Sequence, residues 1–208
     1  DADGYFVRLW YRPMRRAELH LSWEDDSLDD PFTLASPTSA ERLRLRGRYR
    51  WPNGLSLTAS YLDVDRSNDR SGWSAGAERL DVRLAYTGAR LGWSAGAGRT
   101  DLSRSVDSLV VGGSRAVPFD LRYGARADTV DLAVSWRITG DVTVGGSHRR
   151  FANDRSFEVD RDDWRAYLRG RLDDRYRWAV TYRDVDFREG GIEDFRARLV
   201  ELSVGVDW

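Results

Sequence analysis

Arginine occupies every second position from Arg42 to Arg50, and leucine, glycine and tyrosine fill the positions between. In an extended strand, successive side chains point to opposite faces, so this stretch has one cationic face and one apolar face. The apolar face ends in two aromatic residues, Tyr49 and Trp51. The chain must therefore fold so that the two faces of this strand meet different surroundings.

The same two-residue period recurs along the 208 residues, and it predicts eleven strands and no helix. Their expected ranges are 4–12, 16–24, 41–51, 55–64, 78–87, 90–99, 127–138, 142–151, 162–172, 175–186 and 195–208. Short connections that suit tight turns alternate with long connections rich in Asp, Ser, Gly and Arg. The long ones, which we expect to be external loops, lie near 25–40, 65–77, 100–126, 152–161 and 187–194.

Composition excludes several classes of function. With 33 basic and 34 acidic residues the net charge is −1, whereas nucleic-acid binding normally requires an excess of positive charge. The absence of cysteine excludes disulfides, thiolate metal sites and covalent haem attachment within this chain. No apolar run approaches the roughly 18 residues of a membrane helix, but alternating membrane strands give a much weaker signal.

Aromatic residues cluster near both ends of the apolar strand faces, as in the two girdles of a membrane band. The sequence thus predicts an all-β fold, an antiparallel transmembrane β-barrel in contact with outer-membrane lipid. Alternation alone also fits a soluble β-sandwich acting as a binding module, which remains the alternative. The expected girdle residues are Tyr11, Trp23, Trp51, Tyr61, Tyr86, Trp164, Trp178, Tyr182 and Trp208.

The last nine residues, VELSVGVDW, alternate apolar residues and stop at an aromatic one, Trp208. This stretch resembles the terminal β-signal of bacterial outer-membrane proteins, and the resemblance implies location in the bacterial outer membrane. Single-chain bacterial barrels have an even number of strands. Eleven strands therefore suggest either a missed twelfth strand or the C-terminal portion of a larger barrel, and residues 1–208 are expected to form one such domain.

In a barrel, the charged strand faces would line a polar lumen. The expected lumen-lining residues are Arg42, Arg44, Arg46, Arg48, Arg50, Arg79, Asp81, Arg83, Asp131, Arg165, Arg169 and Arg171. Carboxylates of the same parity should partner the arginines, because an unpaired charge in a dry interior is prohibitively costly. These carboxylates are Glu18, Glu24, Asp81, Asp131, Asp163, Glu201 and Asp207. Such a lumen predicts a porin-like conduit or a housing for a partner.

One hairpin joins the arginine-rich strand through Asn53-Gly54 to the segment SLTASYLDVDRSNDR. This hairpin resembles those of the large MtrB/PioB barrels, which sheathe multihaem cytochromes across the outer membrane. The resemblance implies a periplasmic or lumen-inserted cytochrome as partner in an electron conduit. Any haem would then belong to that partner, and no cofactor is expected in this chain.

Two histidines, His20 and His148, are the candidates for acid-base chemistry. An outer-membrane hydrolase would need one of them beside a nucleophile and a carboxylate, and His20 is the better placed by parity. Acidic loops around Asp25–Asp30 and Asp63–Asp69 could bind calcium, but their spacing matches no EF-hand. We therefore expect no enzyme activity, no catalytic residues and no metal site.

Overall fold

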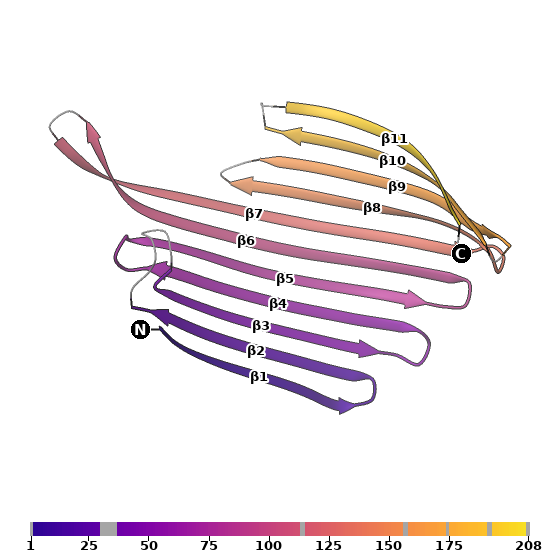
Figure 1. Cartoon of the computed structure of the whole chain (residues 1–208), viewed down its shortest axis with the longest axis horizontal. Coiled ribbons are helices and arrows are strands. Elements are labelled where there is room, and N and C mark those ends of the chain that lie inside the picture. The colour runs from indigo at the N-terminus through magenta and orange to yellow at the C-terminus, as the bar shows by residue number, and fades with distance from the viewer. Residues whose placement is uncertain are drawn as a thin grey trace. The chain divides into compact units, whose positions relative to one another are not determined.

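The computed structural model describes residues 2–29, 37–112, 115–155, 158–173, 175–190 and 193–206, with only the backbone described for 2, 107–121 and 193. All eleven predicted strands are present, and each is hydrogen-bonded to the next in chain order (Figure 1). The strands are β1 Ala2–Met14, β2 Ala17–Leu28, β3 Ser39–Arg50, β4 Leu55–Asn68, β5 Trp73–Thr87, β6 Leu91–Gly112, β7 Arg115–Arg137, β8 Val142–Arg155, β9 Val159–Leu172, β10 Tyr176–Glu189 and β11 Glu193–Val206.

The sheet is antiparallel, and β1 and β11 are the two ends of its hydrogen-bonding order. Among the described residues no ladder joins β1 to β11, so the sheet is not closed. A twelfth strand, or membership of a larger barrel, stays a prediction. No helix long and apolar enough to cross a membrane occurs in the described part of the chain.

Local chemistry explains the tight turns. Gly54 has φ of 86°, which only glycine adopts without strain, and the Asn53 side chain accepts a hydrogen bond from the backbone N–H of Leu55 at 3.2 Å. At the β7–β8 turn, the Thr139 hydroxyl accepts from the N–H groups of Asp141 and Val142. The first predicted strand, 4–12, ends too early, because β1 continues to Met14 and the turn falls on residues 15–16.

The predicted long loops are mostly strand, which corrects the sequence interpretation. The segment 100–126 is the largest difference, since β6 runs to Gly112 and β7 begins at Arg115. The other connections are also shorter than expected: 29–38, 69–72, 156–158 and 190–192, parts of which lie outside the described residues. Backbone hydrogen bonds pair strands regardless of side-chain polarity, so apolar alternation underestimates strand length.

The β-sandwich alternative is wrong. A sandwich buries the inner faces of two packed sheets, whereas these strands form a single sheet. Among the side chains that the structure describes, only those of Ser22, Asn68 and Ala125 are buried. Large apolar side chains such as Leu132 and Val204 are 48% and 70% exposed, so their face has no protein cover.

The chain divides into two compact units, each built from parts of several strands. The first comprises Asp1–Arg48, Ala59–Asp81 and Arg99–Arg126, and the second comprises Tyr49–Thr58, Val82–Gly98 and Ala127–Trp208. In the first, the buried Asn68 side chain accepts hydrogen bonds from the N–H groups of Arg70 and Ser71 and shapes the β4–β5 turn. The second unit contains a charged cleft.

Candidate functional site

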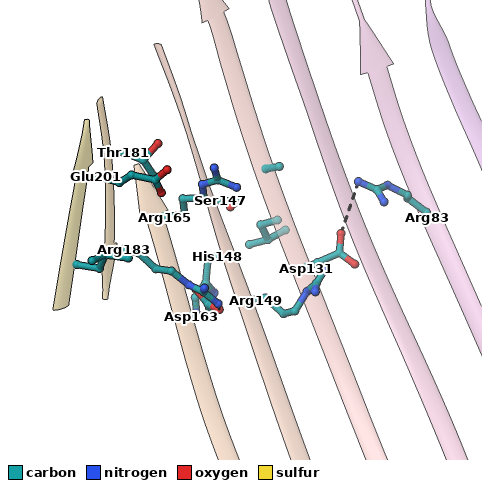
Figure 2. Close-up of a pocket in the computed structure, with 13 residues that line it drawn as sticks. Arg83, Asp131, Ser147, His148, Arg149, Asp163, Arg165, Thr181, Arg183 and Glu201 are labelled. Atoms are coloured by element: carbon teal, nitrogen blue, oxygen red, sulfur yellow. Dashed lines mark hydrogen bonds and ion pairs between the residues drawn. The ribbon is translucent and has the colours of Figure 1, made fainter. Parts of the chain in front are cut away.

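The second unit carries a charged cleft of about 460 Å³ across β5 and β7 to β11 (Figure 2). Most of its lining comes from the polar side of the sheet, here called the polar face, on which the predicted lumen residues Arg83, Asp131 and Arg165 lie. The remaining polar side chains are Ser147, Arg149, Asp163, Thr181, Arg183 and Glu201. The cleft therefore unites three predicted lumen-lining residues and two predicted partner carboxylates, Asp163 and Glu201, with four side chains that were not singled out.

Strand register builds this cleft. Arg165 in β9 lies opposite Ser147 in β8 and Arg183 in β10. One row further along, Asp163 lies opposite Arg149. Because alternate residues of a strand share a face, these neighbouring rows bring their charged groups onto one side of the sheet.

Asp163 is the best-paired carboxylate of the cleft. Its two oxygens accept hydrogen bonds from Arg183, one of them from Nε at 2.9 Å, and Arg161 Nη2 lies 3.2 Å from Oδ2. The Asp163 side chain is only 16% exposed. Two arginines thus neutralise one carboxylate, and this fork geometry is the strong form of such a pair.

Asp131 is held more loosely. Its nearest cation is Arg83, whose Nη2 lies 3.9 Å from Oδ2, and Arg83 also donates to the Ser94 hydroxyl at 2.9 Å. A Cβ atom at Gly96 would come within 2.7 Å of Asp131 Oδ1, so glycine at this position leaves room for the carboxylate.

Two arginines of the cleft have no acceptor. Among the described residues, neither the Arg149 nor the Arg165 guanidinium makes a hydrogen bond or an ion pair. Glu201 also makes none. These guanidinium donors are free to bind water or an anionic ligand.

The arginine stripe of β3 is similarly uncompensated. Arg42 lies 3.4 Å from Glu24, which also binds Arg8 at 3.3 Å. Within the described chain the other four stripe residues have no acceptor, and Nε of Arg48 is buried without one; these four are Arg44, Arg46, Arg48 and Arg50.

Several of the carboxylates expected to partner the lumen arginines bind arginines outside the β3 stripe. Glu18 binds Arg12 at 2.9 Å, and Asp81 binds Arg79 of its own strand at 2.6 Å. Asp207 lies outside the described residues. Four of the five stripe arginines therefore have no acceptor among the described residues.

The predicted lumen residues do not form one site. Arg46 and Arg48 line a cleft of about 410 Å³ in the first unit, together with Trp10, Glu18 and His20. Arg169 and Arg171 line another, of about 710 Å³, near the β7–β8 and β9–β10 turns. Arg79 and Asp81 bind each other on β5.

Several predicted girdle aromatics make specific contacts. Trp164 is 57% exposed and stacks on His148 at 4.0 Å between ring centroids, and Trp23 Nε1 donates to Glu41 at 2.9 Å. Tyr11 and Tyr182 are 55% and 40% exposed. Trp208 lies outside the described residues. The remaining predicted girdle residues lie on or beside strands: Trp51, Tyr61, Tyr86 and Trp178.

Neither histidine assembles a catalytic triad with the nearest serine of its strand. His148 Nε2 lies 2.9 Å from Asp162 Oδ1, but Ser147 precedes it in β8 and its side chain points to the other face. His20 shares its face with the buried Ser22. No group of three His, Asp or Glu side chains that could hold a metal occurs among the described residues.

Sequence reasoning missed Arg149, Ser147, Thr181 and Arg183 as site residues. Two glycines, Gly145 and Gly146, interrupt the alternation of β8, which hid the parity of Ser147 and Arg149. For Thr181 and Arg183 the alternation in β10 was visible. Only the cross-strand register, which the sequence does not show, brings them to Arg165.

The fold is that of the outer-membrane β-barrels, all-β with one antiparallel sheet. No protein-family model matches the sequence, and no curated protein matches it either.

Similar solved structures include OmpT with loop L8 deleted, an outer-membrane protein of Vibrio cholerae, with 13% identity and a TM-score of 0.57 over 97% of this chain and 78% of that one. The copper transporter OprC matches with 13% identity and a TM-score of 0.58, over 98% of this chain and 42% of its own. The ferric-catecholate import receptor Fiu of E. coli K12 matches with 8% identity and a TM-score of 0.55, over 98% of this chain and 49% of its own.

At these identities the likeness concerns the fold. This chain spans about half the length of Fiu and less than half that of OprC. The shared fold supports the expected localisation in the outer membrane of Gram-negative bacteria. The fold alone does not identify a solute or a partner, because these depend on the side chains of the polar face.

Proposed function

We propose that the chain forms part of the wall of an outer-membrane conduit whose polar face lines a water-filled passage with a preference for anionic solutes. The observation that carries this proposal is the set of arginines without an acceptor among the described residues: Arg44, Arg46, Arg48 and Arg50 on β3, with Arg149 and Arg165 in the cleft. A guanidinium stays charged at any working pH and presents a planar fork of donors to carboxylates and phosphates.

Desolvation supports a wet passage. Leaving several such charges unpaired in a dry interior would cost several kcal/mol for each ion. Arg44 and Arg46 are exposed, and the cleft is lined mainly by charged and hydroxyl groups. Water and mobile anions can satisfy these donors, as in pores whose selectivity comes from rings of charged side chains.

A second candidate function, the housing of a partner protein, is favoured by aromatic residues on the polar side of β1. Phe6 and Trp10 are 72% and 70% exposed and share their face with Arg8 and Arg12, which lie over their rings at 5.4 Å. Exposed aromatic and arginine side chains together are typical of binding hot spots. By the resemblance to MtrB/PioB barrels, the partner would be a multihaem cytochrome.

One variant tests both functions. The triple change Arg44→Glu, Arg46→Glu and Arg48→Glu reverses three charges of the stripe. Reconstituted in planar bilayers, it should move the reversal potential of the conduit toward cation selectivity. Leu45→Ala, on the opposite face of the same strand, is the matched control and should leave selectivity unchanged.

The two functions differ in a second measurement. A conduit without a partner should purify alone and conduct. A housing should co-purify with its partner, and the triple variant should weaken that complex while the Leu45→Ala control retains it. Unchanged selectivity together with unchanged partner binding would contradict both proposals.

A further inference from the structure

One face of β8 to β11 changes from uncharged to charged side chains at one level. The face opposite the polar face, here called the apolar face, carries no charge over four successive rows of paired residues. These rows run from Leu172, Tyr176 and Val206 up to Gly146, Ala166, Tyr182 and Val200. Its side chains are open, with Leu202 and Val204 71% and 70% exposed.

The next row on that face is the first to contain charged side chains. It consists of His148, Trp164, Asp184 and Arg198, each paired with its neighbour across the four strands. Beyond it, the following two rows contain only one uncharged residue, Ala152. These rows are Arg150, Asp162, Asp186 and Arg196, then Ala152, Asp160, Arg188 and Asp194.

The charges beyond this level bind one another. Asp184 is 13% exposed and accepts hydrogen bonds from Arg196 at 2.9 and 2.6 Å, with Arg198 at 3.4 Å. Asp186 binds Arg188 at 3.0 Å. Such a surface is costly against acyl chains and ordinary in water.

The polar face carries charged side chains on both sides of this level. Below it this face carries Arg165, Arg169 and Arg171. Above it, Asp163 and Arg149 lie in one row with Val185 and Ala197. In the next row Arg161 lies beside Phe187, which stacks on Phe195 at 5.0 Å between ring centroids. Only the apolar face of these four strands therefore changes from uncharged to charged at this level.

We propose that the row His148–Trp164–Asp184–Arg198 is where the apolar face of β8 to β11 passes from acyl chains into the lipid headgroup layer. Beyond this row the strands stand in water, with the charged rows of the former apolar face outward. The inference rests on the proposed membrane conduit only for the presence of a bilayer, and not on what the conduit carries.

The dimensions agree with this assignment. Leu172 lies eight residues from Trp164 in β9, which corresponds to about 27 Å along a strand. A strand tilt of about 40° reduces this to about 20 Å of depth, comparable with the apolar band of about 25 Å in outer-membrane barrels. Trp164 and Tyr182 at its upper end have the amphipathic rings favoured at headgroup level.

Single cysteines test the boundary, because the chain contains none of its own. Nitroxide labels are attached in phosphatidylcholine vesicles, and their accessibility to oxygen and to a water-soluble nickel chelate is measured. The sites on β10 are Val180→Cys, Thr181→Cys, Asp186→Cys and Phe187→Cys. A second set on β11, Leu202→Cys, Arg196→Cys and Ala197→Cys, covers the case in which loss of Asp186 disturbs folding.

Labels at 180 and 202 should be reached by oxygen and protected from nickel. Labels at 186 and 196 should be reached by nickel, as should those at 187 and 197 on the other face of the same strands. Nickel protection at 186 and 196 equal to that at 180, or nickel access at 180 and 202, would overturn the boundary. Nickel access at 181 reports the water-filled conduit independently, so either proposal can fail while the other stands.

Discussion

On the polar face, some arginines are paired with an aspartate and others have no acceptor among the described residues. Asp163 binds two arginines, Arg161 and Arg183, whereas Arg149 and Arg165 beside it bind no acceptor in the described chain. Asp163 therefore organises the cleft, because it holds two of the guanidinium groups in place. Under the proposed function, the arginines without an acceptor are the ones that would meet the solute.

The single change Asp163→Ala should destabilise the folded chain by roughly 1–3 kcal/mol, the range for removing hydrogen bonds to a charged group. It leaves Arg161 and Arg183 without their shared carboxylate and close to Arg165. Glu201→Gln is the control, because Glu201 makes no ion pair among the described residues, and its effect should stay within about 0.5 kcal/mol. Urea unfolding from lipid vesicles measures both, and equal losses would contradict the role given to Asp163.

The two faces of each strand should differ in how well they tolerate a charged side chain. Val82 and Leu132 are 42% and 48% exposed on the apolar face, whereas Ser135 lies on the polar face near the backbone carbonyl of Gly92. Exposed apolar side chains at mid-strand are stable only when lipid covers them. A charge should therefore be costly on one face alone.

Arginine at Val82 or Leu132 should cost about 2–4 kcal/mol of folding free energy in a bilayer, as expected for a charge at its midplane. Arginine at Ser135 should cost far less, since its side chain would enter a polar face. Folding titrations into vesicles compare the variants. Similar costs at Leu132 and Ser135 would show that the two faces do not meet different solvents.

In the whole molecule, successive connections between strands lie alternately at one end of the strands and at the other. The turns 15–16, 51–54, 88–90, 138–141 and 173–175 end one set of strands, and the connections 29–38, 69–72, 113–114, 156–158 and 190–192 end the other. In outer-membrane barrels short turns face the periplasm and longer loops face outward. The connection 29–38 is therefore expected outside the cell.

A protease recognition sequence inserted after Phe32 should be cut on intact cells, and one inserted after Asn53 should not. The reason is that only the first site would lie outside the outer membrane. Permeabilised cells provide the control, in which both sites should be cut. Cleavage after Asn53 without permeabilisation would reverse the topology.

The sequence by itself determined the strands and their faces. Alternation in a strand depends only on local backbone geometry, so Arg44 and Leu45 could be assigned to opposite sides without a structure. The number of strands and the turn at Asn53-Gly54 follow from equally local rules. For the same reason the outer-membrane fold could be predicted from the aromatic ends of the apolar faces.

The tertiary structure decided which charges are paired and where the strands end. Asp163 meets Arg183 only through the β9–β10 register, and β6 and β7 extend over the expected loop 100–126 because their backbones pair with each other. The change from uncharged to charged rows at His148 and Trp164 likewise becomes visible only once four strands are aligned. These features depend on hydrogen-bond partners distant in sequence, and a local period carries no information about them.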